Sequence, residues 1–387
     1  MKLFCLKPIY WLLIVVFAVH VFVAAIPSNY FVFDEAYYVP SSVDALHGIA
    51  SNLEHPPLVK LLVGAAIGLG GDNWLMWRLP IILFAVAASY FVYLIAKRFL
   101  SERLSLFAVG LLSLSTIFLL VGSCSILEVP FIAFGLAGVY LALRGKYGLS
   151  GLMFGLGFLC KELAVLVFAA TFIYLASRRI GVWKLLWFGA VGFLAAFFGL
   201  WLFELVYQPL VQGVLVGNPI QHLWIVVNYQ FNLNGLRNKA DALWTVWYPP
   251  VAWVSPFGAN AWNPQRWIWL TVGGKLYYQF TPQPNGAVEY LMFPLLVLLP
   301  AAYWFKRNAL ALVSWLCLCF SFLPWLLVGF FVRTEANFYV DASVPFLCLG
   351  CAYLYSLIRS RRLRWSLALI QLALGVIFFL VYFPIPL

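Results

Sequence analysis

The sequence predicts an all-α polytopic membrane protein, and its composition and its apolar runs carry that prediction. Apolar residues make up 65% of the 387 residues, charged residues make up 10%, and the mean hydropathy is +0.96. Charged residues are about a quarter of a soluble domain, so an ordinary soluble fold is excluded. Many apolar runs approach the length of about 20 residues that a helix needs to cross a bilayer. Residues 1–387 are therefore predicted to form one integral membrane unit.

The first apolar run, Ile9 to Ile26, follows Lys2 and Lys7 and is interpreted as a transmembrane helix. A cleaved signal peptide is the alternative, because Ala24-Ala25-Ile26 resembles a signal-peptidase site. The run is long for such a segment, which favours a retained helix. Further spans are predicted at about residues 79–96, 104–121, 126–143, 185–206, 288–305, 310–331, 340–357 and 365–382.

The apolar stretch from Gly148 to Ala176 is interrupted by Lys161-Glu162, and the positive-inside rule decides how often it crosses. Two short crossings that meet at Lys161-Glu162 place every basic cluster on the side of the N-terminus, whereas one crossing splits the clusters between two faces. These clusters are Lys97-Arg98 with Arg103, Arg144 with Lys146, Arg178-Arg179 with Lys184, Lys306-Arg307, and Arg359 to Arg364. We therefore predict eleven transmembrane helices, with the N-terminus cytoplasmic and the C-terminus outside.

This topology places the acidic residues on the outer side. Of the thirteen Asp and Glu residues, only Glu102 stays cytoplasmic. The net charge of +11 then comes largely from cytoplasmic loops, and it indicates a lipid bilayer rather than nucleic acid as the partner. The seven cysteines lie mostly within apolar runs, without metal-ligand spacing, and are interpreted as small buried residues. Any chemistry is expected on the outer face.

The first predicted outer loop, residues 27–78, concentrates polar groups directly after an apolar span. It contains Asp34-Glu35, followed by two further acids and two histidines, with no Lys or Arg before Lys60. Such groups are costly near a bilayer, so they indicate a functional site. The alternative is that Asp34-Glu35 forms the N-cap and first turn of a helix to about Gly48. His55-Pro56-Pro57 then predicts an extended entry into the next helix.

The second long outer segment, residues 207–287, is rich in aromatic residues, proline and glycine. A loop of this length without secondary structure would be unusual. We expect interfacial helices whose aromatic side chains lie at the lipid headgroups, and a platform for a sugar or acceptor is compatible with that. The tryptophans concerned are Trp224, Trp244, Trp247, Trp253, Trp262, Trp267 and Trp269.

Four features fall on the outer face: the acidic loop, Arg78, Glu128, and Lys161 at the end of Gly155-Leu156-Gly157-Phe158-Leu159-Cys160-Lys161. Together they resemble the GT-C glycosyltransferases, specifically the protein O-mannosyltransferase family that uses dolichyl-phosphate-mannose. Asp34-Glu35 is similar to the family's Asp-Glu motif, and His55-Pro56-Pro57-Leu58-Val59-Lys60 is similar to its His-Pro-Pro-Leu-x-Lys motif. The segment from Arg333 to Phe346, which includes Tyr339, looks like the family's late arginine and aromatic-Pro-Phe segment.

The chain departs from the family's pattern in two places. Glu128 stands where the family often has Asp, which makes its role less secure. The chain has no soluble carbohydrate-binding insert of the eukaryotic kind, which leaves the acceptor open among protein Ser/Thr, lipid and glycan. The related lipid-A aminoarabinose transferases usually carry Lys-Pro-Pro-Leu, so His55 favours the mannosyltransferase branch, in a prokaryotic or archaeal member.

The resemblance implies an inverting transfer of mannose, or a similar hexose, from a polyprenyl- or dolichyl-phosphate sugar to an acceptor hydroxyl. Asp34 is assigned as the catalytic base, and Glu35 as its neighbour, free to cap a helix or orient a cation. Donor phosphate and sugar are assigned to Arg78, Lys161, Arg333, His55, Glu128, Lys60 and Tyr339. One base and positive charge at the phosphate are sufficient for this reaction, so no cofactor is expected.

Other interpretations of these residues stay open. Arg78 and Arg333 each fit a snorkelling interfacial residue, and Glu162 is expected to pair with Lys161 or Arg78. A metal held by Asp34, Glu35 and His55 is disfavoured by the spacing of adjacent acids. Rival functions are transfer of another sugar to a lipid or glycan, as in aminoarabinose transferases, a polyprenyl-lipid transporter or flippase, and a non-catalytic subunit. A transporter usually shows internal repeats and broken helices, and neither is clear in this sequence.

Overall fold

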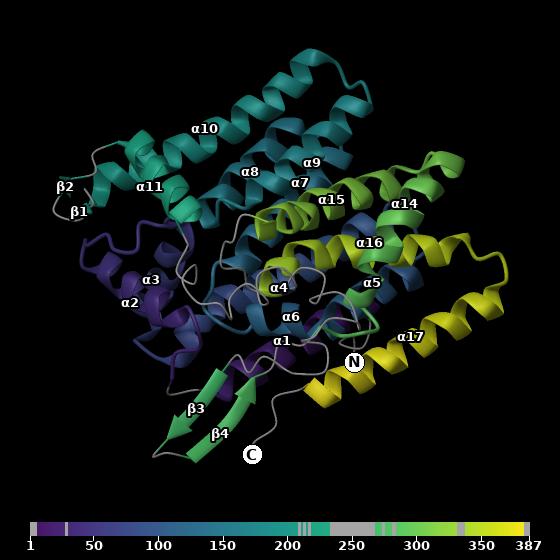
Figure 1. Ribbon diagram of the computed structural model, residues 1–387, viewed down its shortest axis with the longest axis horizontal. Coiled ribbons are helices and arrows are strands. Elements are labelled where there is room, and N and C mark those ends of the chain that lie inside the picture. Colours follow the sequence, from purple (N-terminus) through teal and green to yellow (C-terminus); the bar gives the residue numbers. More distant parts are fainter. Residues whose placement is uncertain are drawn as a thin grey trace. The chain divides into compact units, whose positions relative to one another are not determined.

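The computed structural model is mainly helical (Figure 1). Its contacts group into two compact units, each made of separate chain segments. Unit 1 contains Met1–Val23, Ser89–Leu120 and Asn238–Leu387, and unit 2 contains Ala24–Ala88 and Val121–Arg237. The prediction of a single unit stays a prediction. The structure describes residues 6–27, 30–207, 210–211, 214–215, 218–232, 268–272, 275–280, 284–330 and 337–382.

Six described helical segments are long and apolar enough to cross a membrane, so the chain is a multi-pass membrane protein. They are α1 (Pro8–Ala25), α4 (Trp74–Lys97), α10 (Val182–Tyr207), most of α15 (Ala309–Phe330), the segment Tyr339–Leu357, and most of α17 (Arg361–Tyr382). Each predicted span coincides with a described helix, or with the pair α5 (Glu102–Leu114) and α6 (Thr116–Val121). The number of crossings, eleven, stays a prediction.

Four helices of unit 2 form a bundle: α7 (Glu128–Leu143), α8 (Tyr147–Cys160), α9 (Ala164–Ser177) and α10 (Figure 1). The Ser150 hydroxyl donates to the Gly138 carbonyl at 2.7 Å, which joins α8 to α7. Phe154 of α8 meets Phe168 of α9, with ring centroids 5.5 Å apart. A Cβ at Gly155 would lie 2.7 Å from the Gly192 carbonyl oxygen, so a glycine is required where α8 meets α10.

The turn between α8 and α9 lies at the end of the bundle where α7 begins, because neighbouring helices here run antiparallel. This turn holds Lys161 and Glu162, and α7 begins at Glu128. The turns at Arg144 and Arg179 lie at the opposite end. The predicted division of residues 148–176 into two helices is confirmed, and both basic turns share one end of the bundle as predicted.

The first outer loop also folds into two packed helices, α2 (Glu35–Leu46) and α3 (Leu58–Gly70). A Cβ at Gly64 would lie 2.6 Å from the Ser42 carbonyl oxygen, so this glycine allows α3 to approach α2. The predicted helix after Asp34 is confirmed, and Pro57 stands at the N-cap of α3.

Unit 1 contains α14 (Met292–Lys306), α15, α16 (Val344–Leu357), α17 and two short 3₁₀ helices, η2 (Glu289–Leu291) and η3 (Asn337–Ser343). The Asn285 amide donates at 2.8 Å to the carbonyl oxygens of Leu114 and Gly375, which ties α5 to α17. These contacts satisfy carbonyl groups in an apolar surrounding where an unpaired group is costly.

The second long loop is only partly helical where it is described. It contains α11 (Pro219–Asn232) and two antiparallel hairpins: β1 (Leu210–Val211) with β2 (Val214–Leu215), and β3 (Ile268–Val272) with β4 (Lys275–Phe280). The expectation of helices is wrong for β3 and β4, where Ile268 pairs with Phe280. Trp224 of α11 is 65% exposed. The other six tryptophan side chains named above lie outside the described part.

Candidate active site

Asp34 is the N-cap of α2 and is only partly buried. The Tyr38 hydroxyl, one turn along the helix, donates a hydrogen bond to its carboxylate. Burial raises the pKa of Asp34 from 3.8 to about 7. The charge of Glu128 adds to the rise, while Lys161 and the Tyr38 hydrogen bond oppose it. A carboxylate with this pKa can accept a proton near neutral pH, as a general base must.

Glu128 and Lys161 form an ion pair at the end of the α7–α10 bundle that holds the α8–α9 turn. The Lys161 ammonium donates directly to Glu128 Oε1, and the two side chains are only 5% and 3% exposed. Glu128 comes from the first turn of α7, and Lys161 follows the last turn of α8. Two buried charges of opposite sign compensate each other here, and both act on Asp34.

Arg78 of α4 is completely buried and uses all five of its N–H groups on protein oxygens. Its Nε and Nη2 donate to the two carboxylate oxygens of Glu35 at 2.8 and 2.6 Å. Its remaining N–H groups donate to the carbonyl oxygens of Ala24, Pro27 and Tyr30 at 2.7, 3.1 and 2.9 Å. The phosphate role assigned to Arg78 stays a prediction, and this geometry favours a positioning role.

Glu35 is as fully engaged as Arg78. Besides the arginine, its carboxylate accepts hydrogen bonds from the backbone N–H groups of Val32 and Ser125, at 2.7 and 2.5 Å. The Glu35 side chain is 0% exposed. Of the two roles expected for Glu35, the contacts with Arg78 fit the orientation of a cation, while its bond from Val32 N–H holds the turn before α2 rather than capping that helix.

His55 and Lys60 of the His-Pro-Pro motif have different surroundings. The Lys60 ammonium donates to the His55 carbonyl at 2.9 Å and also to the carbonyl and the side-chain oxygen of Asn52, so it closes its own loop. His55 Nδ1 donates to Glu162 Oε2 at 3.2 Å. Glu162 therefore pairs with His55, and the expectation that it pairs with Lys161 or Arg78 is wrong.

Two tyrosines hold the His55 ring in addition to Glu162. Tyr38 and Tyr229 each meet the imidazole edge-to-face, with ring centroids 5.9 and 5.7 Å away. Neither tyrosine was predicted from the sequence. Tyr38 lies four residues after Asp34 on a helix, which is a readable signal. Tyr229 has no local signal, because its contact with His55 is long-range.

Two assigned residues cannot be placed beside this cluster. Tyr339 belongs to unit 1, where its ring stacks on Trp325 with centroids 4.4 Å apart and an interplanar angle of 12°. Arg333 lies outside the described residues. Their assignments to the donor stay predictions.

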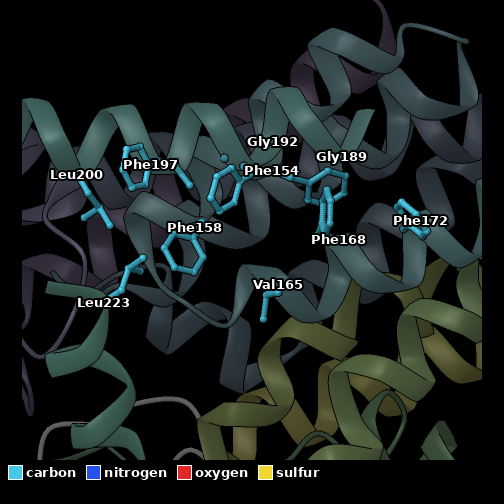
Figure 2. A pocket seen from close by; sticks show the side chains of 13 residues that line it. Phe154, Phe158, Val165, Phe168, Phe172, Gly189, Gly192, Phe197, Leu200 and Leu223 are labelled. Atoms are coloured by element: carbon cyan, nitrogen blue, oxygen red, sulfur yellow. The ribbon is translucent and has the colours of Figure 1, made fainter. Parts of the chain in front are cut away.

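An apolar groove of about 360 Å³ runs along α8, α9 and α10 (Figure 2). Its wall includes Phe154 and Phe158 of α8, and the Leu200 and Leu223 side chains lie at one end while Phe172 lies at the other. Phe158 is one helical turn before Lys161. One residue of the groove wall is therefore three positions in the sequence from the charged turn that carries Lys161 and Glu162.

Comparisons with known proteins agree with the resemblance predicted from the motifs. A family model described as dolichyl-phosphate-mannose-protein mannosyltransferase matches residues 54–203. A polyprenol-phosphate-mannose–protein mannosyltransferase of Corynebacterium glutamicum is 23% identical, over 97% of this chain and 89% of the relative. The resemblance to this family is confirmed.

Solved structures share the fold. The apo structure of the Archaeoglobus fulgidus oligosaccharyltransferase has a TM-score of 0.60 at 12% identity, covering 98% of this chain and 57% of that one. ArnT from Cupriavidus metallidurans bound to undecaprenyl phosphate has a TM-score of 0.55 at 16% identity, covering 95% and 63%. The chain thus spans less than two thirds of these neighbours' length. These likenesses confirm the predicted GT-C fold.

Proposed function

We propose that this chain is a glycosyltransferase that moves mannose, or a similar hexose, from a polyprenyl- or dolichyl-phosphate sugar to an acceptor hydroxyl. The observation that carries the proposal is Asp34, a partly buried carboxylate with a pKa of about 7 beside a compensated Glu128–Lys161 pair. The similarity to a polyprenol-phosphate-mannose–protein mannosyltransferase supports the choice of donor. Protein Ser/Thr, a lipid and a glycan are the candidate acceptors.

The reaction is a single displacement. Asp34 takes the proton of the acceptor hydroxyl while the oxygen of that hydroxyl attacks the anomeric carbon. The bond from this carbon to the phosphate oxygen breaks. The electron pair leaves with the phosphate, and the anomeric carbon is inverted. No second carboxylate is needed as a nucleophile in such a displacement. Glu35, with its oxygens occupied by Arg78 and two backbone N–H groups, supports the position of Asp34 instead.

The departing phosphate needs positive charge. Arg78 has all five of its N–H groups on protein oxygens, and Lys60 closes its own loop. We therefore assign the phosphate to Lys161, which is paired with Glu128 and acts on Asp34, and to Arg333. Phe158 lines the apolar groove and lies three residues before Lys161, so we place the lipid tail along Phe158 and Phe154 (Figure 2) with its phosphate at Lys161. The bound undecaprenyl phosphate of ArnT supports a lipid phosphate as ligand.

We propose that the reaction needs no metal. Among the site carboxylates, Glu35 accepts four N–H groups and Glu128 is paired with Lys161. Glu162 is paired with His55, and among the described residues no group of three or more His, Cys, Asp and Glu side chains is placed to hold a metal ion. Transfer should therefore persist in a chelator, and a loss of transfer restored by Mg²⁺ or Mn²⁺ would contradict this.

We further propose that the N-terminus is cytoplasmic and that the site faces outside. The basic turns at Arg144 and Arg179 lie at the opposite end of the bundle from Lys161, and basic loops favour the cytoplasm. Cysteine-accessibility labelling should find a cysteine near Asp72 exposed outside and one near Arg179 exposed inside. Both sites labelled from one face would reject this orientation.

The direct test is transfer by the purified protein. Radiolabelled polyprenyl-phosphate-mannose is incubated with the protein and membrane extract, and the labelled fraction identifies the acceptor as protein, lipid or glycan. Anomeric analysis of the product then tests inversion. No label transfer, together with movement of the labelled lipid between leaflets of a vesicle, would instead establish a lipid transporter.

Transfer of another sugar to a lipid is the second candidate, since ArnT structures share the fold over more than nine tenths of this chain. His55 stands against it, because the aminoarabinose transferases resembled in the sequence usually carry lysine there. Competition between polyprenyl-phosphate-mannose and other polyprenyl-phosphate sugars in the same assay separates the two candidates.

A further inference from the structure

Helix α11 contacts three functional parts of unit 2. Two of its residues, His222 and Val226, are buried, and Tyr229 follows them at helical spacing and is 36% exposed. The opposite face, with Ile220 and Trp224, is exposed. Leu223, between these faces, lines the end of the apolar groove (Figure 2). The role of α11 in the site therefore depends on the contacts that His222 and Tyr229 make.

The first contact is a buried pair between α11 and α10. His222 Nδ1 lies 2.5 Å from Glu204 Oε1, and the two side chains are 0% and 1% exposed. Glu204 is the one acidic residue of α10, and the Phe203 ring packs against the imidazole with centroids 5.8 Å apart. A buried acid–histidine pair in such apolar surroundings is costly and indicates a functional constraint.

The second contact, two turns later, is at the active site. Tyr229 meets His55 edge-to-face, with an interplanar angle of 80°. His55 is thereby held on one side by Tyr38 of α2, on another by Tyr229 of α11, and at Nδ1 by Glu162. Of these three contacts, only that of Tyr229 depends on the position of α11.

We propose that the Glu204–His222 pair is a latch that fixes α11 on α10, so that Tyr229 sets the orientation of the His55 ring. Glu204, His222 and Tyr229 are then positioning residues that act through His55. The proposal rests on the proposed function, because it places His55 at the sugar donor. Displacements of about 1 Å at a reacting centre can cost about 10²-fold in rate, so a loose α11 lowers turnover without removing any catalytic group.

The test compares the latch with Tyr229 in a double-mutant cycle. Glu204→Leu/His222→Leu removes the pair without leaving a lone buried charge, an exchange that is often tolerated. This variant and Tyr229→Ala should each lower kcat about tenfold, with the donor KM little changed. Combined, they should cost no more than the larger single effect, because residues that act in series are not additive. Multiplying effects, or full activity in the latch variant, would overturn the proposal.

The matched control is His20→Leu, which removes another buried histidine, one that packs on Phe118 in unit 1. Its effect should multiply with that of Tyr229→Ala. Glu204→Gln keeps an acceptor for His222 and should retain near wild-type kcat. If it loses as much kcat as the double leucine variant, a hydrogen-bonded latch is wrong.

Hydrogen–deuterium exchange gives a readout that does not need activity. The double leucine variant in nanodiscs should exchange the α11 amides faster than wild type, and His20→Leu should not. If the wild-type protein transfers no sugar, the proposed function is rejected. The exchange data would still test whether the Glu204–His222 pair fixes α11. Unchanged exchange in α11 would reject the latch even in an active enzyme.

Discussion

Asp34 and Glu35 are neighbours in the chain and have opposite surroundings. Glu35 is 0% exposed and accepts four N–H groups, two of them from Arg78. Asp34 is partly exposed, accepts a hydrogen bond from Tyr38, and otherwise faces the charges of Glu128 and Lys161. Successive residues of a helix diverge by about 100°, so one acid points into the protein and the next faces the site. The pair combines a structural acid with a reactive one.

The structural acid serves the reactive one. Arg78 binds Glu35 and the carbonyl oxygens of Ala24, Pro27 and Tyr30 together, so it joins α4 to the segment that leads into α2. This arrangement fixes the first turn of α2, where Asp34 stands. A buried pair of this kind is valuable here for the geometry it specifies rather than for its net stability.

The comparison predicts first that Asp34 is needed for transfer but not for the stability of the fold. Asp34→Asn keeps the side-chain shape and should lower transfer by about 10²–10⁴-fold, since a general base contributes that much. Binding of the lipid donor should be nearly unchanged, and the variant should unfold at a temperature no lower than wild type at neutral pH, because it removes a carboxylate whose ionisation is disfavoured by burial. Asp44→Asn, on the same helix with its acceptor for Ser51 retained, is the control and should stay active. Near wild-type transfer by Asp34→Asn would remove Asp34 from the mechanism.

The second prediction concerns the buried ion pair of Glu35 and Arg78. Glu35→Gln should destabilise the protein by about 3–5 kcal/mol, because it leaves the buried Arg78 charge uncompensated. Arg78→Lys should also destabilise it, because it keeps the charge but leaves buried acceptor oxygens without a donor. Lysine has three donors, so it cannot replace the five that Arg78 uses. Thermal unfolding of the detergent-purified variants measures this. Glu102→Gln, which removes an exposed pair with Lys97, should cost at most about 1 kcal/mol.

A different outcome for Arg78→Lys would change the role assigned to Arg78. If Arg78→Lys unfolds like wild type and loses only donor affinity, Arg78 contacts the phosphate as the sequence analysis assigned. The distinction between a structural and a reactive pair would then have to be drawn elsewhere in the site.

The third prediction is the pH dependence of transfer. Asp34 acts as a base only when deprotonated, so transfer should fall about tenfold per pH unit below its pKa of about 7 and level off above it. The same raised pKa means that the folded state binds the Asp34 proton more tightly than the unfolded state. Stability should therefore decrease as pH rises from 3.8 to about 7, and this slope should be smaller in Asp34→Asn. A flat rate profile through pH 7 would contradict the assignment.

The sequence predicted the features that depend on local pattern. The apolar runs match the described helices, and the charged interruption at Lys161-Glu162 marks the turn between α8 and α9. The helix after Asp34 followed from the interpretation of Asp34-Glu35 as an N-cap and an acidic first turn. These predictions succeed because each depends on neighbours in the chain.

The features that the sequence could not predict depend on long-range contacts. The five partners of Arg78 include three backbone carbonyl groups, which carry no residue-specific signal. The pairing of His55 with Glu162 joins residues 107 positions apart. The β3–β4 hairpin was missed because aromatic interfacial segments fit a helix or a strand equally well.

The last prediction tests the smallest effect, the influence of Glu128 on Asp34. The charge of Glu128 raises the pKa of Asp34, and the charge of Lys161 lowers it. Glu128→Gln removes the first influence and leaves the Lys161 charge without the compensating charge of Glu128, so both changes act in the same direction. The midpoint of the pH–rate profile should therefore move to lower pH, by about one unit, as a nearby charge typically shifts a carboxyl pKa. Asp44→Asn should leave the midpoint in place. An unchanged midpoint in Glu128→Gln would mean that Glu128 does not share the electrostatic surroundings of Asp34, and that burial alone makes this acid a base.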